Sequence, residues 1–211
     1  MRRPAGRSND SKHVVAGPRS PVASRLLGIA AQLFWRNGYA GTTTRALSET
    51  LGVKRASLYH HIEKKEDLLY AICVNALQNI LSRARAGVTG AESSRDRVEA
   101  LIHGHLTAVL QDKSQHATML TELRALSSDR RQQIVAMRDE YENFVEGVVQ
   151  EGQASGALRD DLSTKLLTLG LLDLLNWAIF WFDEDGELDA KSLASAFASL
   201  FLDGAKAPPT A

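Results

Sequence analysis

The sequence predicts an all-α protein of about nine helices, and three observations lead to that class. Apolar residues recur at spacings of three and four along most of the 211 residues, which is the period of an amphipathic helix. Helix-ending glycines follow several of these stripes, as at Asn37-Gly38 and Gly52. No stretch combines strand-like alternation with turn signals. The chain is long enough to bury a sizeable core.

The first helix is expected to begin at Val22 and to end at Asn37-Gly38. One apolar stripe runs along it, made of Leu26, Leu27, Ala30, Leu33 and Phe34. Residues 1–21 precede it with many Arg, Ser, Gly and Pro residues and no apolar period. We therefore expect residues 1–21 to form a disordered basic tail.

Two short helices are expected next, at about 45–51 and 54–62. The hydroxyls of Thr42-Thr43-Thr44 are suited to cap the first of them, and Gly52 permits a sharp turn between the two. Four residues face inward across this turn: Leu47, Leu51, Leu58 and Ile62. Together with the first helix, the pair predicts a three-helix unit that ends in a helix-turn-helix.

A longer helix follows from about Lys65 to Arg85, and residues 87–94 are expected to form a loop. Cys73, in the middle of this helix, is expected to be a buried small apolar residue, with a redox sensor as the minority alternative. Further helices are expected at about 95–112, 115–126, 129–154, 162–182 and 190–203.

A net charge of zero conceals a separation of charge along the chain. Residues 1–65 carry 12 Lys and Arg against 3 Asp and Glu, a net charge of +9. Residues 66–211 carry 13 against 22, a net charge of −9. The basic third therefore predicts a nucleic-acid surface, and the acidic remainder is expected to point away from it. The arginines of residues 1–21 can add contacts to the bound nucleic acid.

Several classes of protein are disfavoured by composition. One cysteine allows no intramolecular disulfide, and no apolar stretch approaches the roughly 20 residues that span a bilayer. His103 and His105 face opposite sides of a helix, which argues against a metal site. No catalytic arrangement of Ser or Cys with His is detectable, so we expect no enzyme and no cofactor. We expect a cytoplasmic protein with no membrane partner.

The segment from Leu26 to Leu69 resembles the DNA-binding domain of the TetR family of bacterial transcriptional regulators. The resemblance rests on motifs in matching order and spacing: Leu33-Phe34, Gly38-Tyr39, Thr43-Thr44, Gly52-Val53, Leu58-Tyr59-His60-His61-Ile62 and Lys65-Glu66-Asp67-Leu68. Two positions depart from the family pattern. Lys54 stands where a capping serine is frequent, and Ile62 stands where the family has phenylalanine. Neither departure threatens the expected fold.

The resemblance and the side-chain chemistry together imply a set of contacts to duplex DNA. Arg45 and Arg55 are expected to read guanine in the major groove, with a phosphate contact as the alternative for each. The remaining members are expected to contact the backbone or to lie close to it: Thr43, Thr44, Lys54, Ser57, Tyr59, His60, His61 and Lys65. Simple capping is the alternative for Thr43 and Thr44, and bracing of the three-helix unit is the alternative for Tyr59.

For residues 66–211 the resemblance implies a domain that binds a small ligand and forms a homodimer. Apolar residues cover almost every face of the stretch from Leu166 to Phe182, so we expect it to be buried on several sides. In this family the last two helices form a four-helix interface with the partner. Its seam is expected to include Phe197, Leu200 and Phe201.

Asn176-Trp177 with Trp181 resembles TetR-type regulators of fatty-acid and steroid breakdown, which respond to acyl-CoA thioesters. Core or dimer packing is the alternative for these tryptophans. Arg124, Arg130 and Arg131 are candidates for contact with a phosphate-bearing ligand, and a solvated basic patch is the alternative for them. The candidate lining of an apolar effector pocket is His105, Met119, Leu123, Phe144, Trp177, Phe180 and Trp181.

The sequence thus predicts a helix-turn-helix domain at 22–65 and a ligand-binding and dimerisation domain at 66–211. The expected function is a repressor that binds a palindromic DNA operator as a homodimer and is released by a small apolar or acyl-CoA-type effector. A ligand-independent DNA-binding regulator or an activator is the alternative. An enzyme acting on acyl thioesters is a remote alternative, because the required catalytic spacing is missing.

Overall fold

The computed structural model describes residues 21–58 and 62–204, and in these ranges every regular element is a helix. The helices at the N-terminal end are α1 (Pro21–Gly41), α2 (Thr44–Leu51) and α3 (Arg55–Leu58), and α4 (Lys65–Thr89) is the long helix that follows them. The C-terminal part contains α5 (Ser94–Gln111), α6 (Lys113–Thr121), the 3₁₀ turn η1 (Leu123–Ala125), α7 (Ser128–Ala154), α8 (Thr164–Trp181) and α9 (Ala190–Gly204). The predicted all-α class is confirmed.

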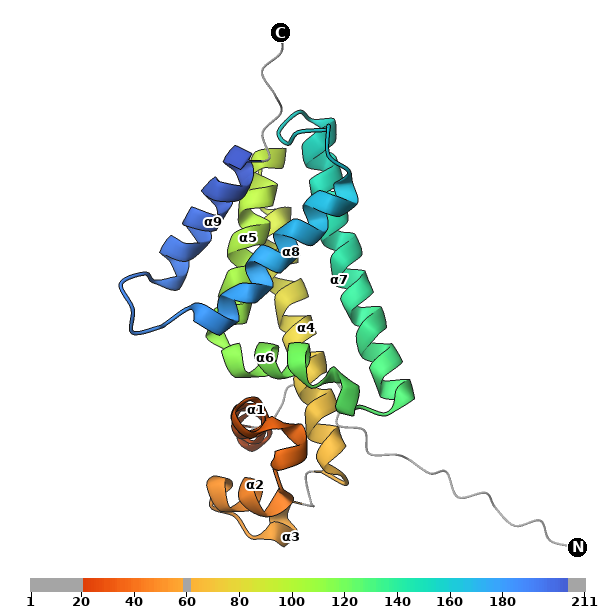
Figure 1. Ribbon diagram of the computed structural model, residues 1–211, viewed down its shortest axis with the longest axis vertical. Coiled ribbons are helices and arrows are strands. Elements are labelled where there is room, and N and C mark those ends of the chain that lie inside the picture. The colour runs from red at the N-terminus through yellow and green to blue at the C-terminus, as the bar shows by residue number, and fades with distance from the viewer. Residues whose placement is uncertain (1–20, 59–61, 205–211) are drawn as a thin grey trace, which may run out of the picture.

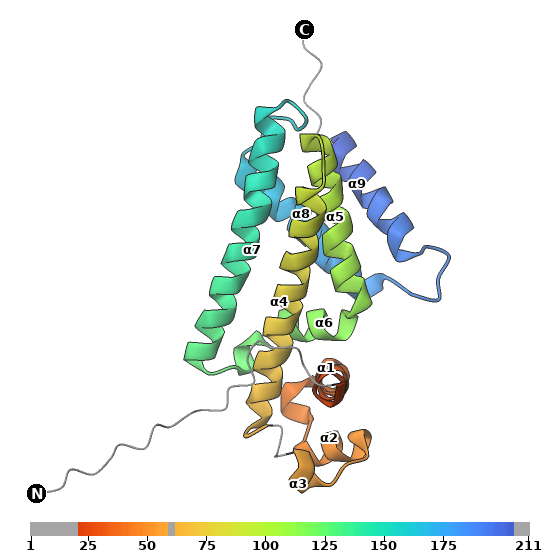
Figure 2. The same cartoon turned by 180° about the vertical axis from the view of Figure 1, so that it is seen from behind.

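The molecule is elongated, with α1, α2 and α3 at one end and the remaining helices stacked above them (Figure 1). Helix α4 extends from the small unit into the larger one. Helix α8 crosses in front of α4 and α5 in Figure 1, and the view from behind shows α7 and α9 on opposite sides of the α4–α5 pair (Figure 2).

Two apolar cores correspond to these two parts. The lower core joins α1, α2, α3 and the first half of α4, with Phe34, Leu47 and Leu58 fully buried, and it also takes in Met119, Leu126 and Ile134. The upper core joins the end of α4 to α5, α7, α8 and α9. Helix α4 contributes to both cores and therefore connects the two parts of the molecule.

Helix boundaries agree with the sequence pattern, with three differences. The predicted break at Gly38 is present as a non-helical residue, with φ of 72°, but a short helical segment continues to Gly41. Helix α4 continues to Thr89 through the expected start of a loop. The single helix expected at 115–126 is divided into α6 and η1, because Glu122 leaves helical geometry.

The α4–α5 pair packs closely because α5 has no side chain at Gly104. A Cβ atom there would lie 2.9 Å from the Arg83 carbonyl oxygen and 3.0 Å from Ala84 Cα. A methyl group at this position would push the two helices apart, which is why the glycine is tolerated inside a helix.

Cys73 is fully buried in α4, as the sequence predicted. Burial raises the pKa of its thiol to about 12, so the reactive thiolate is disfavoured at neutral pH. This environment suits a packing residue and not a redox sensor.

Candidate nucleic-acid interface and buried polar cluster

Helix α2 begins with the predicted threonine cap. Thr43 has extended backbone geometry, and its Oγ1 accepts a hydrogen bond from Ala46 N–H at 3.1 Å. The neighbouring Thr42 has a different role, because it is buried and its Oγ1 donates to the carbonyls of Leu33 at 3.1 Å and Gly38 at 2.9 Å. Thr43 therefore caps α2, while Thr42 fixes the end of α1.

The turn between α2 and α3 depends on Gly52. Its φ of 69° and ψ of 28° are left-handed, and Val53 N–H donates to the Ser48 carbonyl at 3.0 Å. This closure ends the helix and redirects the chain. Leu47 on α2 and Leu58 on α3 are both fully buried, so the two helices pack on a shared apolar contact.

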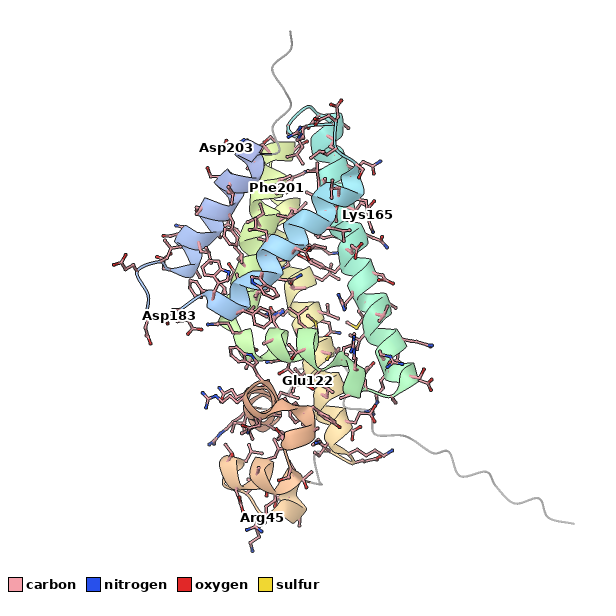
Figure 3. The ribbon with its side chains drawn as sticks, in the orientation of Figure 1. Arg45, Glu122, Lys165, Asp183, Phe201 and Asp203 are labelled. Carbon is pink, nitrogen blue, oxygen red and sulfur yellow. The ribbon has the colours of Figure 1, made fainter. Side chains whose placement is uncertain are left out.

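The outward side of this unit carries polar and cationic side chains. Arg45 is 80% exposed and points away from the body of the protein at the end formed by α2 (Figure 3). Its Nε donates to Glu49 Oε1 at 2.8 Å, one helical turn away. An exposed pair of this kind adds little stability, so Arg45 can leave it for a DNA base or phosphate. Lys54 and Ser57 are also exposed, and Thr44 is half-buried at the start of α2.

The structure describes the remaining candidate DNA contacts only in part. The backbone of Arg55 opens α3, but its side chain lies outside the described residues, as do Tyr59, His60 and His61. Ile62 N–H donates to the Leu58 carbonyl at 3.2 Å.

Lys65 differs from its predicted role. Its ammonium donates to the carbonyls of Tyr39 at 2.7 Å and Thr42 at 2.8 Å, and it lies 4.0 Å from the centroid of the Tyr39 ring. Burial lowers the pKa of this lysine, and the charge of nearby Glu122 acts in the opposite direction. Because two of its three donors are engaged by backbone carbonyls, Lys65 joins α4 to the end of α1.

The start of α4 is also bound to α7. Arg130 Nη2 donates to Asp67 Oδ1 at 2.6 Å, and Nη1 lies 3.7 Å from Glu66 Oε2. Glu66 Oε1 accepts from Ser127 N–H at 2.9 Å. The sequence pattern left Arg130 between a phosphate site and a solvated patch. The structure instead places it in an ion-paired junction between the two parts of the molecule.

A buried polar cluster lies in the upper part, where the sequence pattern had indicated only His105. We use the term histidine cluster for His105 on α5, His116 on α6, Tyr141 on α7 and Asn176 on α8. His105 Nδ1 and Tyr141 Oη share a hydrogen bond of 2.8 Å, and His116 is close enough to act electrostatically on His105. Both histidines and Tyr141 are buried, and Asn176 is half-buried.

The histidine cluster has unused hydrogen-bonding capacity. Within the described ranges, neither His105 Nε2 nor either ring nitrogen of His116 has a hydrogen-bond partner. Burial lowers the pKa of His105 to about 3, with His116 contributing in the same direction and Asn176 opposing it. Burial alone lowers the pKa of His116 to about 4. Both rings are therefore neutral at pH 7.

The other predicted ligand residues divide into two groups. Phe144 is half-buried beside the cluster, with its ring centroid 6.4 Å from that of Tyr141. Met119 and Leu123 lie lower, against the core of the DNA-binding unit. The structure therefore brings His105 and Phe144 together around Tyr141, and it places Met119 and Leu123 at the lower core.

Trp177, Phe180 and Trp181 are on the outside of the chain, which does not suit the predicted wall of an internal pocket. Trp177 is 66% exposed, and the two other rings are about half exposed. With Leu166 and Leu169 they form one stripe along α8. Beside it, α9 exposes Leu200 and the small residues Ser192, Ser195, Ala196 and Ser199. We call this surface the α8–α9 face.

The described part of the chain contains no helix that is long and apolar enough to cross a membrane. A capped helix-turn-helix with outward cations, mounted on a larger helical unit, defines a DNA-binding transcriptional regulator. Residues 26–72 match the family described as "Bacterial regulatory proteins, tetR family", and residues 91–205 match the "Tetracyclin repressor-like, C-terminal domain". The chain belongs to the TetR family, and it is a regulator and not an enzyme.

Comparison with individual proteins agrees with this assignment. The chain is 28% identical over 191 residues to the HTH-type transcriptional repressor KstR2 of Rhodococcus jostii, covering 90% of this chain and 94% of that protein. It is 30% identical to the TetR family regulator PfmR of Thermus thermophilus, with a TM-score of 0.78 over 85% of this chain and 97% of that one. A structure of AibR in complex with isovaleryl coenzyme A and operator DNA shares the fold, at 24% identity and a TM-score of 0.76 over 85% and 97% of the two chains.

Proposed function

We propose that this protein is a ligand-responsive transcriptional repressor that binds a palindromic operator as a homodimer. In this proposal residues 22–65 read DNA, residues 66–211 bind the effector and the partner subunit, and residues 1–21 form a basic tail. The effector is a small apolar molecule or an acyl-CoA-type molecule that releases the operator. The observation that carries the proposal is the exposed, cationic α2–α3 unit at one end of a helical body with an unpartnered apolar face.

The α2–α3 unit supports the DNA-binding part of the proposal. Arg45 points outward at the end of the molecule formed by α2 (Figure 3), Lys54 and Ser57 are exposed in the same unit, and Arg55 opens α3. The surrounding first third of the chain carries a net charge of +9. Such a surface suits a helix entering the major groove between two rows of phosphates. Tyr59, His60 and His61 remain proposed backbone contacts, and Thr43 and Thr44 are proposed to hold a phosphate at the start of α2.

The α8–α9 face supports the homodimer. A large exposed apolar patch is unusual on a monomer, and here five apolar side chains follow one stripe of α8. The small residues on α9 allow a second helix to approach closely. Two copies related by a twofold axis would bury both faces and present two α2–α3 units to one duplex, with half-sites about one helical turn apart. We therefore assign Trp177, Phe180 and Trp181 to this interface and not to the effector site.

The comparisons support the effector class. AibR is described in complex with isovaleryl coenzyme A and operator DNA, and KstR2 is named a transcriptional repressor. The Asn176-Trp177 pattern resembles regulators that respond to such thioesters. An effector releases DNA only to the extent that it binds the non-binding conformation more tightly than the DNA-binding one. A ligand-independent regulator is the alternative, and it predicts operator binding that no small molecule changes.

A titration of fluorescently labelled promoter DNA tests the proposal. The DNA would be the region beside the protein's own gene, and binding would be followed by anisotropy across a series of salt concentrations. We expect specific binding that weakens steeply with salt, and release when acyl-CoA thioesters of increasing chain length are added. Salt-insensitive or absent binding would contradict the DNA-binding part, and binding without release would favour the ligand-independent alternative.

A further inference from the structure

We propose that the histidine cluster forms the polar end of the effector site and hydrogen-bonds an uncharged carbonyl group of the effector. The inference rests on the proposed function, since it specifies which chemical group of the effector reaches the core. The carbonyl belongs either to an acyl thioester or to an apolar ketone. His105 and His116 supply the N–H groups, and Tyr141 holds His105 in place.

The free protein's arrangement of these histidines is energetically costly. Three ring nitrogens of two buried histidines have no hydrogen-bond partner within the described residues. A buried polar group without a partner costs about 1–3 kcal/mol. Native proteins contain few such groups. The cluster is therefore better explained by a bound group that completes these hydrogen bonds.

The unpartnered nitrogens supply hydrogen-bond donors. A neutral imidazole carries one N–H and one acceptor nitrogen. Whichever nitrogen of His116 holds the proton, that N–H lacks an acceptor, because both ring nitrogens are unpartnered among the residues described. If Tyr141 donates to His105 Nδ1, the proton of His105 lies on Nε2, which gives a second N–H donor beside the Asn176 side chain that interacts with this ring. A carbonyl oxygen has two lone pairs and can accept from both rings.

The surroundings of the cluster favour an uncharged group. Of the residues whose burial the structure describes, no lysine or arginine is fully buried, and Tyr141 of the cluster belongs to the upper apolar core together with Leu101, Leu106 and Val145. A carboxylate or phosphate placed here would be desolvated without a compensating cation, which costs several kcal/mol. A free fatty acid would have to be protonated, whereas a thioester or ketone carbonyl meets the requirement directly.

The position of His116 connects the cluster to the DNA-binding unit. His116 lies on α6, two residues before Thr118, whose Oγ1 donates to the Ala31 carbonyl of α1 at 3.1 Å. One residue before His116, Gln115 accepts a hydrogen bond from Asn75 of α4 at 2.8 Å. An effector that hydrogen-bonds to His116 therefore acts on α6, the short helix that contacts both α1 and α4. Occupancy of the cluster can thereby change the position of the DNA-binding unit.

The test compares probes that differ only in the carbonyl oxygen. In the first arm, isovaleryl-CoA and longer acyl-CoA thioesters are paired with the S-alkyl-CoA thioethers of equal length. In the second arm, a fused-ring ketone is paired with its parent hydrocarbon. The corresponding free carboxylic acids form a third set. Affinity for the full-length protein would be measured by calorimetry at pH 7.5, and operator release by anisotropy. The arm that contains the tighter-binding probe identifies the source of the carbonyl.

We expect the protein to bind the carbonyl probe about tenfold more tightly than its matched partner, as expected for one buried hydrogen bond, and to bind the free acid more weakly. His105→Leu and His116→Leu should each reduce that preference to about threefold or less. His103→Leu is the matched control. It lies two residues away on α5, but its ring faces Ser195 of α9, with Nε2 3.4 Å from Oγ, so the preference should persist. Circular dichroism would confirm folding, and His116→Gln provides a second variant that keeps a polar side chain.

Two results would overturn the inference while leaving the proposed function intact. In the first, the protein binds each carbonyl probe and its matched partner with equal affinity, and both probes release the operator. The other is a crystal structure with a releasing probe in which an ordered water, and not the probe, fills the cluster. If no probe of either arm binds the protein or releases the operator, the inference and the proposed effector class are both wrong.

Discussion

Arg130 of α7 and Asp67 of α4 are joined by a hydrogen-bonded ion pair, with Nη2 and Oδ1 2.6 Å apart. The pair lies where α4 leaves the DNA-binding unit. Asp67 Oδ2 also accepts from the N–H groups of Glu63 at 3.0 Å and Lys64 at 2.7 Å, so it caps α4 as well. Burial acts to raise the pKa of Asp67, but these hydrogen bonds and the charge of Arg130 hold it below its usual value. One carboxylate therefore orders the start of α4 and attaches it to α7.

Arg130→Gln should lower the free energy of unfolding by about 1–2 kcal/mol, because it leaves a partly buried carboxylate with fewer partners. The full value for a buried pair is not expected, since Arg130 retains some exposure and solvent screens the charges. Urea denaturation measures the change. Arg131→Gln, at the exposed neighbouring position, is the control. Equal effects of the two substitutions would mean that the ion pair contributes nothing specific.

Lys65→Met should destabilise the protein by about 1–3 kcal/mol, because it removes both hydrogen bonds that connect α4 to the end of α1. Operator affinity should fall, but the slope of log affinity against log salt should not change. A phosphate contact would instead reduce that slope by about one. Lys64→Met, at an exposed position, is the control for the loss of a charge. A reduced slope for Lys65→Met with unchanged stability would restore the original prediction for this residue.

Arg45→Ala should cost about 1–3 kcal/mol of operator binding and relax specificity at one base position, if this side chain reads a base. The measurement is affinity for a set of operators with single base changes. Glu49→Gln tests the ion pair separately. This substitution frees the guanidinium and removes a negative charge near the phosphates, so affinity should stay equal or rise. A uniform loss on all operators after Arg45→Ala would identify a phosphate contact instead.

Stability should fall as pH decreases from 7 to 5. The pKa values of His105 and His116 in the folded protein, about 3 and about 4, lie below the value of about 6.5 in the unfolded chain. In this range the unfolded state therefore binds protons that the folded state does not, and stability rises with pH. The two histidines together should account for roughly 4 kcal/mol between pH 7 and pH 5.

Urea denaturation at several pH values measures this dependence, and His105→Gln/His116→Gln should flatten it. A flat profile for the unmodified protein would show that these histidines are not held neutral in the fold. The carboxylates interfere little, because they titrate in the unfolded chain below this window.

The sequence predicted the parts of the structure that depend on local pattern. The helix periods, the Thr43 cap and the Gly52 turn are set by neighbouring residues, so they could be read directly. The end of α4 could not be predicted from Gly87, because the glycines at this point serve close packing between α4 and α5. That constraint comes from a distant part of the chain.

The differences at the candidate site have the same origin. Lys65 is basic, which favours a phosphate contact, but its partners are carbonyls 26 and 23 residues earlier in the chain. Helix α8 is apolar on nearly every side, so the pattern could not show which of its aromatic residues point outward. His116 and Tyr141 had no distinguishing motif, and only the packing of α5, α6 and α7 brings them to His105.

Pairing of two DNA-binding units through the α8–α9 face is tested most directly by the mass of the protein in solution and on DNA, before and after a change on that face. Trp177→Glu places a charge in the middle of the face, and Val135→Glu makes the same change at an exposed position on α7. Sedimentation equilibrium would give the mass of each variant alone and with the operator.

We expect the unmodified protein and Val135→Glu to have twice the mass of one chain and to bind a palindromic operator tightly. Trp177→Glu should be a folded monomer whose operator affinity falls by at least about tenfold, because each α2–α3 unit must then bind alone. A Trp177→Glu protein that remains a dimer with unchanged operator affinity would contradict the claim that this face pairs the two DNA-binding units.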